Sequence, residues 1–176
     1  MKKLAVLGIA SALLLGSGCS QETEPKKETT ATKEEKVDLK IELINFQMEV
    51  IDVLKIKHKA IAAYDDAVAA ANNPEVPQEE KPTLEELEQL KAEAIKASEE
   101  LAQDVKKVQV PTELDKHKKA IKEALNDLSA SYESRSKNIG GDVTEADNLF
   151  NEFQTKMGEI FEEEGLLAPD FLKMIL

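Results

Sequence analysis

Residues 83–108 read TLEELEQLKAEAIKASEELAQDVKKV and carry the clearest helical pattern in the chain. Apolar side chains recur there every three or four residues, at Leu87, Leu90, Ala94, Ala97, Leu101, Val105 and Val108. This is the spacing of one face of an α-helix. At the start, Thr83 and Glu86 match a capping box, in which each side chain accepts a hydrogen bond from the other residue's amide. The stretch therefore predicts an amphipathic helix with one buried face.

The same spacing on either side predicts three further helices, over residues 37–72, 112–139 and 143–164. The prolines that follow residue 37 fall between these segments or after the last one, at Pro74, Pro77, Pro82, Pro111 and Pro169. Proline is poorly tolerated inside helices, so its placement supports the boundaries. Connections of about three to ten residues bring successive helices into antiparallel contact. We therefore expect an all-α fold, an up-down four-helix bundle.

The first helix is expected to be longer than its neighbours. About 36 residues span ~54 Å, whereas the 26 or so residues of the second helix span ~39 Å. We expect the excess, residues 37–46, to overhang where the chain enters the bundle. The apolar tail after Gly165, residues 166–176, is expected to form a short C-terminal helix packed against this overhang at the tether end. The alternative is that the overhang or the tail forms a surface that binds a partner or a membrane.

The first residues, MKKLAVLGIASALLLGSGCS, have the layout of a secretory signal. Two lysines precede an apolar run, residues 4–15, which is followed by small residues. As a helix this run would reach only ~18 Å, too short for a bilayer core of ~30 Å. We therefore expect residues 1–18 to be a cleaved signal peptide.

The small residues Gly16, Ser17 and Gly18 directly precede Cys19, the only cysteine in the chain. This sequence resembles the lipobox of bacterial lipoproteins, although Gly16 stands where that family favours leucine. The resemblance implies that Cys19 becomes the lipidated first residue of a mature protein anchored to a bacterial membrane outside the cytoplasm. The alternative is a secreted protein with an incidental cysteine.

A polar stretch without Leu, Ile, Val or Phe follows Cys19 and extends to residue 36. Such a composition cannot bury a core, so residues 19–36 are expected to be the lipidated cysteine and a disordered tether. The helical bundle domain then occupies residues 37–176.

The chain carries 23 Lys and Arg residues against 35 Asp and Glu residues, a formal net charge of −12. This balance repels nucleic acid and the surface of an anionic membrane. We therefore expect no nucleic-acid partner, and membrane attachment through the N-terminal lipid.

The sequence lacks the motifs Glu-x-x-His, His-Glu-x-x-His and Gly-x-Ser-x-Gly, and it lacks a P-loop. We expect no enzymatic activity, no cofactor and no metal site. The two histidines, His58 and His117, lie on apolar stripes of different helices, and helical counting places them about two turns apart. They are expected to be boundary residues with solvated edges and not ligands of one metal ion.

Three residues are candidates for ligand binding. Tyr132 and Arg135, the only arginine, interrupt the apolar seam of the third helix, and Tyr64 on the first helix is expected in the same layer. An arginine offers several hydrogen-bond donors and a tyrosine offers an amphipathic surface. Close helix packing is the default expectation at the end of the bundle farthest from the membrane, and the alternative is a cleft there with these three side chains facing a ligand.

Lysines cluster in residues 55–59 and 116–122. We expect solvated faces with pairs such as Lys119 and Glu123, the alternative being a site for an anion or a cell-wall polymer.

Together these features predict a lipid-anchored extracytoplasmic helical bundle of the bacterial cell envelope. Its expected role is that of a non-enzymatic binding, scaffold or interaction module, with an envelope protein or a cell-wall polymer as a possible partner. The alternative is a lipoprotein that binds a small molecule, an anion or a metal ion in the cleft at the membrane-distal end.

Overall fold

The structure, a computed structural model, describes residues 38–176. The signal peptide, Cys19 and the tether lie outside these residues. The described elements are α1 (Leu39–Asn72), α2 (Leu84–Val105), α3 (Lys118–Asn138), α4 (Thr144–Glu163) and the short α5 (Phe171–Ile175), with single 3-10 turns η1 (Gln78–Glu80) and η2 (Thr112–Leu114).

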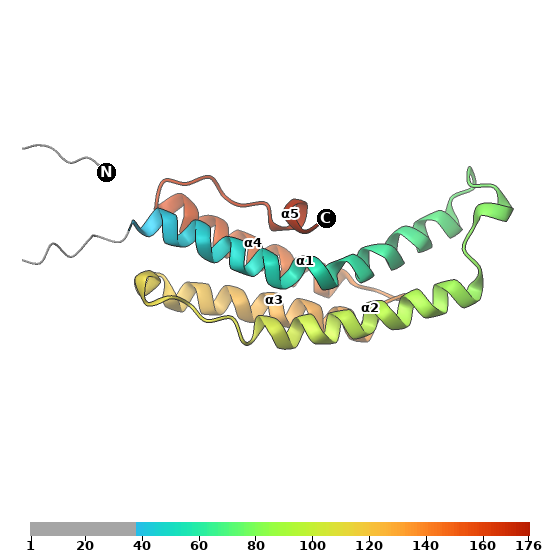
Figure 1. The fold of residues 1–176 in the computed structure, drawn as a ribbon, viewed down its shortest axis with the longest axis horizontal. Coiled ribbons are helices and arrows are strands. Elements are labelled where there is room, and N and C mark those ends of the chain that lie inside the picture. The colour runs from blue at the N-terminus through green and yellow to red at the C-terminus, as the bar shows by residue number, and fades with distance from the viewer. Residues whose placement is uncertain (1–37) are drawn as a thin grey trace, which may run out of the picture. The chain divides into compact units, whose positions relative to one another are not determined.

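The predicted all-α bundle is confirmed, and no strand occurs in residues 38–176. Helices α1 and α2, α2 and α3, and α3 and α4 pack against each other as successive antiparallel neighbours (Figure 1). Over the same residues, no helix combines the length and apolarity needed to cross a membrane.

Helix α2 begins at the predicted capping box. Glu86 donates its backbone N–H to the Thr83 hydroxyl at 3.2 Å, and the Glu86 carboxylate accepts from the Thr83 backbone N–H at 2.7 Å. The predicted apolar face is buried from Ala94 to Val105. The capping box therefore fixes the start of the helix, and burial of one face holds it in the bundle.

Helix α3 begins six residues later than expected, at Lys118. Residues 106–117 instead run along α1 as a connection that contains η2, whose Leu114 is fully buried. Pro111 has no N–H and disfavours helical geometry at the residue before it, so α2 cannot continue through this point. This connection covers the part of the bundle that α2 does not reach.

The expected overhang at the start of α1 is wrong. Leu43 and Phe46 are buried, and a side chain at Gly165, just after α4, would lie 3.5 Å from Lys40 Nζ. The beginning of α1 is therefore level with the end of α4. The excess length lies at the opposite end, where α1 and α2 extend past the α3–α4 pair (Figure 1). The prediction failed because it compared α1 with the second helix alone, whereas η2 packs against α1 and the end of α4 lies beside the first turn of α1.

Helix α4 ends in a Schellman motif. Gly165 has a φ of +69°, and the backbone N–H of Leu166 donates to the Phe161 carbonyl at 2.9 Å. The chain then turns back along α4 and passes Gly158 so closely that an added Cβ there would lie 3.3 Å from Ala168 Cβ. This return brings the tail onto the side of the bundle.

The predicted short C-terminal helix is present as α5 and packs against α1. Asp170 caps it by accepting from the Lys173 backbone N–H at 3.0 Å, and Gln47 of α1 donates to Met174 Sδ at 3.0 Å. Helix α5 lies over the middle of α1 rather than over its first turns (Figure 1). The tail therefore covers the side of the bundle and not its end.

Candidate functional site

A cleft of about 430 Å³ opens on the side of the bundle between α1, α3 and α4, next to α5. Helix α1 contributes His58, Ala62, Asp65 and Asp66; Tyr132 and Arg135 come from α3, Asp147 and Phe150 from α4, and Leu172 and Leu176 from the tail. The cleft therefore combines charged, polar and apolar groups from every long helix except α2.

His58 and Tyr132 form the inner wall. His58 Nδ1 lies 3.1 Å from the Tyr132 hydroxyl, and the two side chains are 8% and 1% exposed. Burial, together with the positive charge of Arg135, lowers the pKa of His58 to about 4, so the imidazole is neutral at neutral pH. Burial also raises the pKa of Tyr132, which keeps the phenol protonated.

This pair sets the direction of its own hydrogen bond. Within residues 38–176, Nδ1 of His58 is the only hydrogen-bond partner of the Tyr132 hydroxyl, so the buried phenol donates its proton to that nitrogen. The neutral imidazole then carries its hydrogen on Nε2. No fully buried side-chain nitrogen or oxygen of the described residues lacks a partner, so Nε2, which has none there, is accessible on a residue that lines the cleft. His58 therefore presents a donor to any bound molecule.

Arg135 lies beside this donor, with its side chain only 15% exposed. Its guanidinium forms a hydrogen-bonded ion pair with Asp147 and lies 3.9 Å from the Asp65 carboxylate. Burial raises the pKa of Asp65, and Asp147 and Asp66 add to this effect, whereas Arg135 opposes it. The carboxyl group of Asp65 is therefore partly desolvated, although Arg135 lies within ion-pair distance.

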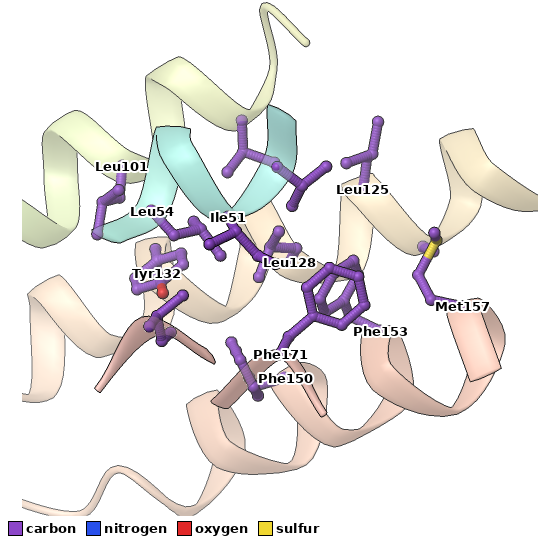
Figure 2. Close-up of a cluster of buried hydrophobic side chains, with 14 of the residues drawn as sticks. Ile51, Leu54, Leu101, Leu125, Leu128, Tyr132, Phe150, Phe153, Met157 and Phe171 are labelled. Atoms are coloured by element: carbon purple, nitrogen blue, oxygen red, sulfur yellow. The ribbon is translucent and has the colours of Figure 1, made fainter. Parts of the chain in front are cut away.

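Aromatic rings connect the cleft with α5. Tyr132 packs edge-on against Phe150, Phe150 packs edge-on against Phe153, and the centroids of Phe153 and Phe171 are 4.6 Å apart. Figure 2 shows these rings side by side in the core. Because Phe171 is fully buried, α5 is held as part of the core and not as a loose flap.

The structure brings two of the three candidate ligand residues together. Tyr132 and Arg135 both line the cleft, whereas Tyr64 lines a separate hollow of about 270 Å³ that includes Gly140 and also reaches Arg135. The expected location is corrected as well, because the cleft lies on the side of the bundle and not at its far end. Helical counting misplaced it since α1 extends past the loop that joins α3 and α4.

The two histidines lie apart, as expected, with different partners. His117 Nε2 lies 2.8 Å from Glu164 Oε1 at the end of α4, far along the chain from the partner of His58. His117 is buried, at 5% exposed, and pairs with Glu164, so its expected solvated edge is corrected, whereas His58, at 8% exposed, keeps an accessible Nε2. In residues 38–176, no three His, Cys, Asp or Glu side chains are grouped to hold a metal ion.

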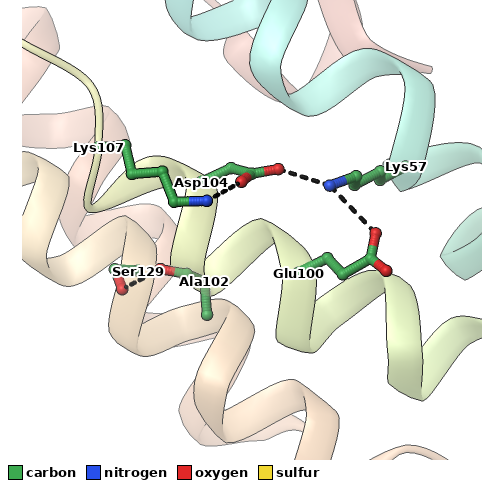
Figure 3. Close-up of polar contacts among 6 residues, drawn as sticks. All are labelled: Lys57, Glu100, Ala102, Asp104, Lys107 and Ser129. Atoms are coloured by element: carbon green, nitrogen blue, oxygen red, sulfur yellow. Dashed lines mark hydrogen bonds and ion pairs between the residues drawn. The ribbon is translucent and has the colours of Figure 1, made fainter.

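The lysine clusters form ion pairs within the bundle. Lys57 on α1 lies 3.1 Å from Glu100 and 2.5 Å from Asp104 on α2, and Asp104 also pairs with Lys107 (Figure 3). Hydrogen bonds to Asp104 and Glu100 raise the pKa of Lys57.

In the second cluster, Lys119 and Glu123 pair at 3.9 Å, as expected. Lys116 lies 2.5 Å from Glu164 Oε1. The lysines of both clusters that form these pairs join or support helices, and none of them lines the cleft.

Sequence reasoning missed the acidic side of the cleft. His58, Ala62, Asp65 and Asp66 follow one another at intervals of four, three and one residues, which places them along one face of α1. This line of polar residues beside an apolar stripe could have been recognised in the sequence. The contribution of Leu172 and Leu176 to the cleft could not have been recognised, because it depends on the path of the tail.

The arrangement suits binding. The Ser131 hydroxyl, which also lines the cleft, donates to the Ala146 carbonyl at 2.7 Å and not to His58. The groups that face the cleft are hydrogen-bond donors, carboxylates and apolar surface, the usual components of a ligand pocket. Comparison of the chain with protein-family models, with curated proteins and with solved structures finds no match in any of the three.

Proposed function

We propose that this protein is a lipid-anchored, non-enzymatic binding protein of the bacterial cell envelope that takes a small ligand in the cleft between α1, α3 and α4. The observation that carries the proposal is the convergence of His58, Arg135 and Asp65 on one apolar-walled cleft of about 430 Å³. Pockets of 300–1,000 Å³ with a few placed polar groups are the common form of small-molecule sites.

The anchor rests on the N-terminal sequence. Cys19 is the only cysteine and follows the small residues that a lipobox places before its lipidated cysteine. Attachment through several acyl chains is stable, whereas one chain gives marginal membrane binding. In the proposed arrangement the lipid holds an acidic domain outside the cytoplasm, where a diffusing ligand reaches the side of the bundle.

A labelling experiment tests the anchor. Cells that express the full chain are fed a clickable palmitate analogue, and the wild type is compared with Cys19→Ser. We expect label and membrane fractionation for the wild type and loss of both for the variant. Labelling of Cys19→Ser, or an unlabelled wild type, would contradict the anchor.

Native mass spectrometry tests the cleft. The protein is purified from membranes without unfolding, and the wild type is compared with two variants on neighbouring residues of α1. Ala62→Trp fills the cleft, whereas Ala63→Trp places the same side chain on the exposed face as a matched control. We expect a co-purified small molecule with the wild type and Ala63→Trp only. Its retention by Ala62→Trp with unchanged helical circular dichroism, or its absence from the wild type, would refute binding in this cleft.

A further inference from the structure

The polar groups of the cleft differ in their exposure, although Arg135 contacts the carboxylates of Asp147 and Asp65. The donors lie inside, since the side chains of His58 and Arg135 are 8% and 15% exposed. Two of the carboxylates lie at the mouth, since the side chains of Asp65 and Asp147 are 59% and 54% exposed. A ligand that fits this order places a hydrogen-bond acceptor inward and a positive charge outward.

The charge of the lining also favours a cationic group. Three carboxylates, Asp65, Asp66 and Asp147, face one guanidinium, that of Arg135, and the His58 imidazole is neutral. Arg135 is hydrogen-bonded to Asp147, and among residues 38–176 Asp66 takes part in no ion pair. Three carboxylates against one guanidinium leave the lining with an excess of two negative charges, and a simple anion would meet repulsion at the entrance.

The remaining surface is apolar. Phe150, Ala62, Leu172 and Leu176 complete the walls, and Phe150 stands edge-on to Tyr132. Aromatic faces attract organic cations, and aliphatic walls bury a hydrocarbon side chain. This surface does not suit a hydrated metal ion.

Resting on the proposed function, we infer that the ligand is a small organic ammonium ion with a carbonyl or carboxylate oxygen close to its nitrogen. This chemistry is shared by free amino acids and by the amino termini of peptides. The ammonium group binds at Asp65 and Asp66, and the oxygen accepts from His58 Nε2–H and from the free N–H groups of Arg135. The hydrocarbon part packs against Phe150 and the leucines of the tail.

A matched series of three compounds separates the parts of this inference. L-Leucinamide has the ammonium, the carbonyl and an isobutyl group; isopentylamine lacks the carbonyl, and 4-methylpentanamide lacks the ammonium. Calorimetric titration of the full chain in detergent is expected to give at least tenfold tighter binding for L-leucinamide than for either analogue. Equal or tighter binding of an analogue, or no measurable binding of L-leucinamide at millimolar concentration, would overturn the inference.

A pair of variants tests the position of the ammonium group. Asp66→Asn removes an unpaired carboxylate of the cleft, and Asp52→Asn removes an exposed carboxylate of α1 outside it. We expect Asp66→Asn to weaken L-leucinamide binding at least fivefold and Asp52→Asn to leave it unchanged. Equal effects of the two variants, or no effect of Asp66→Asn, would overturn the inference.

Two further ligands distinguish a free amino acid from the amino terminus of a peptide as the natural ligand. Tighter binding of free L-leucine than of L-leucyl-L-leucinamide supports a free amino acid, and the reverse order supports a peptide amino terminus. If none of these compounds binds while Ala62→Trp still abolishes retention of the co-purified molecule, the inference fails and the proposed function stands.

Discussion

His58 on α1 and Tyr132 on α3 are joined by a hydrogen bond of 3.1 Å between Nδ1 and the phenol oxygen, inside the wall of the cleft. Their rings meet edge-on, with centroids 6.2 Å apart. This contact ties the longest helix to the centre of the bundle and holds the imidazole with Nε2 toward the cleft. The stability of the fold and the chemistry of the site therefore depend on the same pair.

The free energy of unfolding should decrease as the pH is lowered, because His58 is held neutral in the folded protein. Its pKa is 6.5 in an unfolded chain and about 4 in the folded protein, so between these values the unfolded state binds a proton that the folded state does not. Acidification from pH 6.5 to 4 therefore favours unfolding, by on the order of 3 kcal/mol from this residue. Denaturant titrations at several pH values measure the effect.

His58→Asn provides the control for this prediction, because it removes the titrating group. The variant should show a smaller loss of unfolding free energy over the same pH range than the wild type. Identical pH dependence of the two proteins, or an imidazole that titrates near pH 6.5 by NMR, would show that His58 is not held neutral by burial.

Removal of the phenol oxygen should destabilise the bundle. Tyr132→Phe leaves the buried His58 Nδ1 without its donor, which should cost about 1–2 kcal/mol of unfolding free energy. Tyr64→Phe is the matched control, since no hydrogen bond of the Tyr64 hydroxyl occurs among the described residues, and it should change stability by less than about 0.5 kcal/mol. Equal costs for the two variants would contradict the assigned hydrogen bond.

Anchoring of the C-terminal helix should depend on Phe171. This side chain is fully buried against Phe153, so Phe171→Ala should cost about 3–5 kcal/mol. Leu167→Ala, at a residue 92% exposed in the same tail, should have little effect. Hydrogen exchange should show loss of protection in α5 for the first variant only. An α5 that stays protected without Phe171 would contradict its role as the anchor.

The contacts between α2 and its neighbours should differ in their sensitivity to salt. Asp104→Asn weakens an ion-pair network at the surface, so its cost should be below about 1 kcal/mol and should shrink at high salt. Ser129→Ala removes a buried hydroxyl that donates to the Ala102 carbonyl at 2.9 Å (Figure 3), which should cost about 1 kcal/mol at any salt concentration. A salt-independent effect of Asp104→Asn would contradict this assignment.

The helices could be predicted because each depends on local signals. The start of α2 follows from the side chains of Thr83 and Glu86, and the buried face of α4 follows from its spacing. The delayed start of α3 could not be predicted, because Leu114 is buried by contact with α1 and not by helical periodicity. Local patterns describe an element but not its alignment with the others.

The site could be predicted only in part for the same reason. Tyr132 and Arg135 stood out as polar residues in an apolar seam, and both line the cleft. Tyr64 was grouped with them by counting along separate helices, although a shift along the bundle axis places it beside Gly140 instead. Gly158 lies inside α4, and the reason for a glycine there, the close passage of the tail, is visible only in the tertiary structure.

An experimental structure of the native protein, purified from membranes without unfolding, tests the central claim most directly. The account predicts a bound molecule in the cleft, with its ammonium nitrogen at Asp66 and an oxygen facing His58 Nε2. A cleft that holds only water, with the co-purified molecule bound elsewhere on the bundle, would contradict it.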